Sequence, residues 1–125
     1  MDCPACGGDC VAFPVPEDLR EYLPADAPAT ALCVDCLTLH PTEDADSDPD
    51  FTRIGEAFPT GEAAVPMAML LGLLDSLAIY RQEVTALLER VERAGADPLL
   101  CIDRLSDDDR SVDLGRRRHQ LEQLL

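Results

Sequence analysis

Two Cys-x-x-Cys pairs near the N-terminus constrain what this chain can fold into more than any other feature. Cys3 and Cys6 form the first pair, followed by Gly7, and Cys33 and Cys36 form the second, with 26 residues between the pairs. Two residues between paired cysteines let both sulfurs face one ion, and four thiolates satisfy the tetrahedral preference of zinc. The pattern predicts one structural zinc ion bound by all four cysteines in a zinc ribbon.

Other interpretations of the cysteines stay open at this point. The same four thiolates would bind iron, so an iron–sulfur or rubredoxin-like site is the main alternative. A redox-active pair needs a βαβ context, and disulfides are rare in a reducing cytoplasm. Cys10 or His40 could supply a ligand, although Cys10 is more simply a small apolar residue at the start of a strand. Cys101 lies beside Leu100 and Ile102, and we expect it in the core.

The charge balance is the strongest compositional signal. The chain has 25 acidic and 10 basic residues, a net charge of −15, and every basic residue is Arg. Lys is normally among the commonest residues. Concentrated salt screens repulsion between carboxylates, which keep a protein surface hydrated. We therefore expect a halophilic, archaeal protein; an acidic protein from a GC-rich mesophile is the alternative.

Neither a signal peptide nor a membrane span is expected. Met1 and Asp2 lead directly into the first cysteine pair, which leaves no room for an apolar run. The apolar stretch between Glu62 and Asp75 is shorter than the roughly 18 residues that a span requires, and Gly and Pro interrupt it. These features predict a soluble, cytoplasmic protein with no membrane partner.

Residues 1–40 are predicted to form the zinc ribbon from short antiparallel strands. We expect strands at residues 11–15, 29–33 and 37–40, with Pro14 limiting the first to an edge of the sheet. Residues 16–23 should form one or two helical turns. The acidic segment 41–60 follows, and its polar residues and prolines predict a linker that separates two parts of the chain.

Residues 61–125 are predicted to form about three helices, which makes the fold α+β. The first should span residues 66–94, with Pro66 in its first turn and Gly95 just beyond its end. Asp97 and Pro98 should begin a second helix that ends near residue 105. A third is expected from about residue 111 to residue 125.

The 66–94 segment also carries a heptad pattern, which predicts self-association. Its apolar residues are spaced alternately three and four apart: Leu70, Leu73, Leu77, Tyr80, Val84, Leu87, Val91 and Ala94. A helix of about 29 residues is about 43 Å long, so the shorter helices that follow could not cover both of its apolar stripes. We expect a homodimer, with coiled-coil character, through this helix. The alternative is a monomeric hairpin covered by the ribbon.

These features together resemble a known group of proteins. The Cys-Pro-x-Cys-Gly motif on a short, acidic, Lys-free chain is similar to the small zinc-finger proteins of haloarchaea, in a family known only as a domain of unknown function. The motif covers the first third of the chain, and the rest matches only in general character. The resemblance implies zinc binding at Cys3, Cys6, Cys33 and Cys36 and no established activity.

Three functional classes can be compared on the sequence. A protein-interaction or adaptor module is favoured, with its partner unidentified. The alternative is a nucleic-acid- or transcription-associated protein, but residues 1–40 contain only Arg20 against seven acidic residues. Arg116, Arg117 and Arg118 form a basic run that we interpret as a solvated helix face. An enzyme is not expected, because four thiolates leave a zinc site closed and no nucleophile–base set is recognisable.

Overall fold

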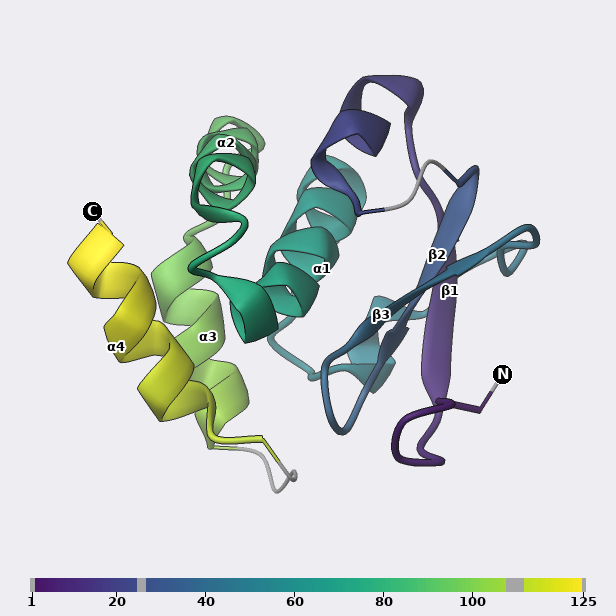
Figure 1. Cartoon of the computed structure of the whole chain (residues 1–125), viewed down its shortest axis with the longest axis horizontal. Coiled ribbons are helices and arrows are strands. Elements are labelled where there is room, and N and C mark those ends of the chain that lie inside the picture. Colours follow the sequence, from purple (N-terminus) through teal and green to yellow (C-terminus); the bar gives the residue numbers. More distant parts are fainter. Residues whose placement is uncertain (1, 25–26, 108–111, 125) are drawn as a thin grey trace.

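The computed structural model describes residues 2–24, 27–107 and 112–124. A three-stranded antiparallel sheet at the N-terminal end precedes a set of helices, so the α+β prediction is confirmed. Its strands, β1 (Cys10–Pro14), β2 (Ala29–Cys33) and β3 (Leu39–Thr42), lie in the order β1-β2-β3. Figure 1 shows the sheet at one side of the molecule and the helices stacked on one of its faces.

The strands follow the sequence pattern closely. Strand β2 has the predicted bounds, and β1 lies at an edge of the sheet, as Pro14 required. Strand β3 begins two residues later than predicted, because Leu37 and Thr38 belong to the turn that contains the second cysteine pair. Between β1 and β2, the short 3-10 helix η1 (Glu17–Tyr22) forms the predicted helical turns.

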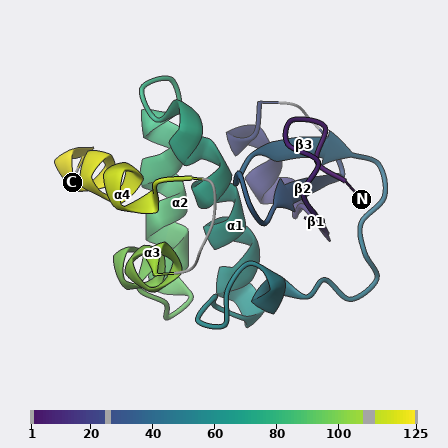
Figure 2. The ribbon, with the colours of Figure 1, turned by 90° about the horizontal axis from the view of Figure 1, so that it is seen from below.

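The helices form the other side of the molecule. After the short 3-10 helices η2 (Phe51–Arg53) and η3 (Gly61–Ala63) come α1 (Ala64–Leu73), η4 (Leu74–Ser76), α2 (Arg81–Arg93), α3 (Pro98–Ser106) and α4 (Leu114–Leu124). Viewed from below, α1 lies between the sheet and the remaining α-helices (Figure 2). Across the residues that the structure describes, no helix combines the length and apolar character needed to cross a membrane.

The prediction of one helix over residues 66–94 is wrong. Helix α1 ends at Leu73, η4 adds a single turn, and α2 starts only at Arg81. The carbonyl of Ser76 accepts hydrogen bonds from the N–H groups of Ile79 (3.0 Å) and Tyr80 (3.1 Å), which closes this turn. After this turn α2 packs against α1, and the two helices run side by side in Figure 2. Heptad spacing persists across the turn, so periodicity alone could not distinguish two packed helices from one long helix.

Burial explains why α1 is apolar nearly all round. Eight of its ten residues are buried, since the sheet covers one side of the helix and α2 covers another. The second, partial apolar stripe consists of Leu71, Leu74, Ala78 and Leu88, and all of these except Ala78 are buried within the same chain. The seam residues Leu70, Leu73, Val84, Leu87 and Val91 all lie in the core of the chain.

The segment predicted as a linker takes part in this core. Ile54 and Phe58 are buried, and the ring of Phe51 lies 5.5 Å from that of Phe13 and 5.7 Å from that of Phe58. One apolar cluster contains residues of β1 and β2, of this segment and of the α-helices. The three parts predicted as 1–40, 41–60 and 61–125 thus share one core, because the acidic composition of 41–60 concealed three apolar anchors.

Asp46 gives this segment a second role, at the edge of the sheet. Its N–H donates to the Ala12 carbonyl (3.1 Å), and its carboxylate accepts from the Ala12 N–H (3.4 Å). These bonds cover part of the free edge of β1, where unpaired backbone groups would otherwise be open to another strand.

Candidate metal centre

The four predicted cysteine sulfurs converge at one end of the sheet. Their Sγ atoms all lie within 4.8 Å of one another. The Sγ atoms of Cys3 and Cys36 are 3.6 Å apart, and those of Cys6 and Cys33 are 3.5 Å apart. A tetrahedral site with Zn–S bonds of about 2.3 Å has S–S edges of about 3.8 Å. The group therefore has the dimensions of a four-thiolate metal site.

The two cysteine turns share one backbone geometry. In the first, the Cys3 carbonyl accepts from the Gly7 N–H (2.8 Å); in the second, the Cys33 carbonyl accepts from the Leu37 N–H (3.1 Å). The residue four positions after the first cysteine has a positive φ in both turns, 79° at Gly7 and 55° at Leu37. Leu37 is the one non-glycine residue with a positive φ in the part of the chain that the structure describes.

Backbone N–H groups in these turns point at the sulfurs. The N–H of Ala5 donates to Cys3 Sγ, that of Gly8 to Cys6 Sγ, and that of Cys36 to Cys33 Sγ, each at 3.4 Å. These donors can stabilise the negative charge that thiolates carry.

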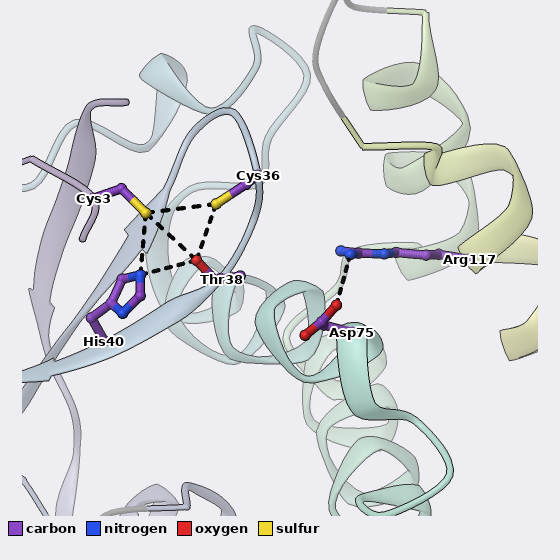
Figure 3. Close-up of polar contacts among 6 residues, drawn as sticks. All are labelled: Cys3, Cys36, Thr38, His40, Asp75 and Arg117. Atoms are coloured by element: carbon purple, nitrogen blue, oxygen red, sulfur yellow. Dashed lines mark hydrogen bonds and ion pairs between the residues drawn. The ribbon is translucent and has the colours of Figure 1, made fainter. Parts of the chain in front are cut away.

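Thr38 and His40 complete the surroundings of the Cys36 and Cys3 sulfurs (Figure 3). The Thr38 hydroxyl lies 3.1 Å from Cys36 Sγ and 2.9 Å from His40 Nε2, and the same ring nitrogen lies 3.3 Å from Cys3 Sγ. A thiolate can only accept hydrogen bonds, so with thiolates present the hydroxyl donates to Cys36 and the imidazole N–H is directed toward Cys3 and Thr38. Each of the four sulfurs then has at least one hydrogen-bond donor.

The pKa values of the cysteines differ strongly across the group. Burial acts to raise the pKa of Cys3, but hydrogen bonds from the backbone, Thr38 and His40 outweigh it and lower this pKa to about 5. At Cys6 the Gly8 N–H acts to lower the pKa, yet the neighbouring thiols of Cys33, Cys36 and Cys3 bring it up to about 12. Burial also raises the pKa of Cys36. A bound metal must therefore displace protons, so acidification should weaken binding.

The two remaining cysteines lie outside the sulfur group. Cys10 is buried opposite Cys33 in the β1–β2 register, and Cys101 is buried in the helical part of the core. Burial raises the pKa of Cys10 to about 12 and that of Cys101 to about 11, so both favour the protonated thiol. Their position agrees with the prediction that both act as small apolar residues.

The sequence analysis missed Thr38 as a partner of the sulfurs and treated His40 only as a substitute ligand. A usable signal was present for Thr38 and His40, which are two residues apart where the turn leads into β3. Cys36 does not share this alternation, because Leu37 between Cys36 and Thr38 has a positive φ. Alternate residues of an extended chain point to the same side. Within the described residues, the candidate metal group consists of the four cysteines, and His40 contacts it from outside.

The arginine run at the other end of the molecule is not simply a solvated face. Arg117 Nη2 lies 3.1 Å from the Asp75 carboxylate, and the Arg117 side chain is only 15% exposed (Figure 3). Arg118 forms ion pairs with Asp103 and Glu122. The expectation is therefore wrong for Arg117 and Arg118, which fasten α4 to η4 and α3.

Fold and site together define a small α+β protein with a candidate four-cysteine metal centre. A family model described as "Family of unknown function (DUF6276)" matches residues 2–125, and the chain belongs to this family. No match was found among the curated proteins or among the solved structures.

Proposed function

We propose that this protein binds one structural zinc ion through Cys3, Cys6, Cys33 and Cys36. The observation that carries the proposal is the convergence of four sulfurs with tetrahedral spacing, each close to a hydrogen-bond donor. Zinc is favoured over iron because four thiolates in two such turns form a common structural zinc site, and a redox-inactive ion suits a structural role. The donor set fits zinc without any change in the ligands.

The role proposed for the ion is structural and not catalytic. Four protein ligands fill a tetrahedral site, which leaves no position for water or substrate. The ion would join two turns that are distant in the sequence, the one before β1 and the one between β2 and β3. In this way it would fix one end of the sheet on which α1 packs.

We further propose that the module acts through protein interaction, as an adaptor. Nucleic-acid binding is the less favoured function, because Arg117 and Arg118 already pair with carboxylates. The proposed setting is the cytoplasm of a salt-accumulating archaeon, where free thiolates would survive and salt would screen the acidic surface.

Metal analysis of cysteine variants tests the zinc proposal. Purified protein should contain one zinc per chain, and Cys6→Ala or Cys36→Ala should abolish stoichiometric binding. Cys10→Ala and Cys101→Ala are matched controls, because these buried thiols lie outside the group, and both should retain the metal. The ligand assignment fails if a control variant loses zinc while Cys6→Ala keeps it. Iron in place of zinc would overturn the metal assignment alone.

A further inference from the structure

The turn that joins α1 to α2 carries the more exposed of the two large apolar side chains that stand out at the described surface. Ile79 is 75% exposed, whereas its neighbours Leu77 and Tyr80 pack partly against the core. The other large apolar residue that stands out at the described surface is Leu100, at 46% exposure, in α3. At this exposure Ile79 contributes little to the packing of its own chain.

Ile79 also forms part of the wall of a groove. The groove has a volume of about 680 Å³ and is bounded by the turn and by the C-terminal half of α4. Leu77 and Leu124 supply apolar surface, while Gln120 and Gln123 supply polar groups that carry no charge. The exposed Ile79 side chain and the groove therefore lie on the same face of the molecule. This is the arrangement that a two-fold interface needs, because each copy must present both elements to the other.

The balance of charge around the groove favours contact between two copies of this acidic chain. The groove is lined by one carboxylate, Asp75, and one basic side chain, Arg81. Asp75 is already paired with Arg117 at 3.1 Å (Figure 3), so among the described residues that line the groove no carboxylate lacks a basic partner. Elsewhere the acidic side chains of two copies would repel each other, given a net charge of −15 on each.

We propose that this face is a self-association surface, with the Ile79 turn of one copy seated in the groove of a second copy. The heptad pattern predicted a dimer through the helical seam, but most seam residues are buried in the core. The interface proposed here is instead the turn between α1 and α2, which interrupts that seam. The inference does not depend on the metal, because the groove and the sulfur group have no residue in common.

Sedimentation of the zinc-loaded full chain tests the proposal. The wild-type protein should dimerise at micromolar concentration, and more strongly as KCl rises, because salt screens repulsion and strengthens apolar contacts. Ile79→Glu should raise the dissociation constant at least about tenfold, which corresponds to about 1.4 kcal/mol. Since Ile79 is exposed, the thermal unfolding midpoint should change little when measured on dilute, monomeric samples.

Leu100→Glu is the matched control, because it places the same charge on an exposed apolar position outside the groove. This variant should dimerise like the wild type. A monomeric wild-type protein across the whole salt range would overturn the proposal. So would equal effects of the two substitutions, or a dimer that Ile79→Glu leaves intact.

Discussion

Gly72 of α1 lies so close to Leu39 of β3 that a Cβ on Gly72 would stand 2.1 Å from Leu39 Cγ. Helix α1 can approach the sheet this closely only because position 72 has no side chain. This approach brings the helix onto the strand that continues from the second cysteine turn, and it links the candidate metal centre to the helical part of the core.

Gly72→Ala should therefore destabilise the protein, although Ala favours helices by about 1 kcal/mol over Gly. Overpacking should outweigh that gain and lower the free energy of unfolding by about 1–3 kcal/mol in denaturant titrations. Gly115→Ala in α4 is the control, since a Cβ there meets nothing closer than 3.4 Å, and it should be neutral or slightly stabilising. Truncating the neighbour in Gly72→Ala/Leu39→Ala should give a smaller loss than the two single losses added together. Additive losses would contradict the proposed clash.

At position 37 we expect a glycine variant to be more stable than an alanine variant, which is the reverse of the usual order. The Leu37 side chain is fully buried, but its φ of 55° is a conformation that costs a non-glycine residue about 1–2 kcal/mol. Leu37→Gly and Leu37→Ala should both lower stability through lost burial, yet the Gly variant should be the more stable of the two by about 1 kcal/mol. Equilibrium unfolding of the zinc-loaded variants measures this order. A more stable Ala variant would show that the turn relaxes out of the positive φ region.

His40 should support the metal without binding it. Removing groups that hydrogen-bond to metal ligands typically costs about 10–100-fold in affinity. His40→Ala should therefore weaken zinc binding by about this factor in a chelator competition assay, while one zinc per chain remains at saturation. His119→Ala is the control, because His119 lies on the exposed part of α4 and bonds only to Gln123 among the described contacts. Loss of stoichiometric zinc in His40→Ala would instead make His40 a ligand.

Removal of the metal should affect the whole fold. Because β1, β2 and α1 share one apolar cluster, the chain should melt in a single transition with and without zinc. Chelation should lower that midpoint, since zinc binds only the folded site. Circular dichroism at a helical wavelength follows the change. If chelation left the midpoint of helical unfolding unchanged, the cysteine end and the helices would be independent, as the acidic composition of residues 41–60 predicted.

The sequence predicted well the features that depend on local geometry. The cysteine spacing identified four residues whose sulfurs converge, and the segment that leads into the second cysteine pair was correctly predicted as a strand over residues 29–33. Asp97 accepts a hydrogen bond from the Leu100 N–H at the start of α3, and Gly95 ends α2 with a φ of 92°, both as expected. Each of these signals lies within a few neighbouring residues.

Features that depend on tertiary packing could not be predicted in the same way. The heptad spacing continues unbroken through the turn at residues 77–80, so the sequence carries no local signal that the helix ends there. The helix ends because α2 packs against α1, on a side that the sheet does not cover. Phe51, Ile54 and Phe58 are spaced irregularly among acidic and turn residues, which hid their contribution to the core. The positive φ of Leu37 could not be predicted from the sequence, because leucine rarely adopts it, whereas Gly7 at the equivalent position of the first turn adopts it readily.

X-ray absorption at the zinc edge tests the central claim most directly. The purified, metal-loaded protein should show four sulfur neighbours at about 2.3 Å and no nitrogen or oxygen in the first coordination sphere. His40→Ala should leave that spectrum unchanged, because the imidazole contacts the Cys3 sulfur from outside the group. A spectrum with three sulfurs and one nitrogen, lost in His40→Ala, would contradict the four-cysteine site.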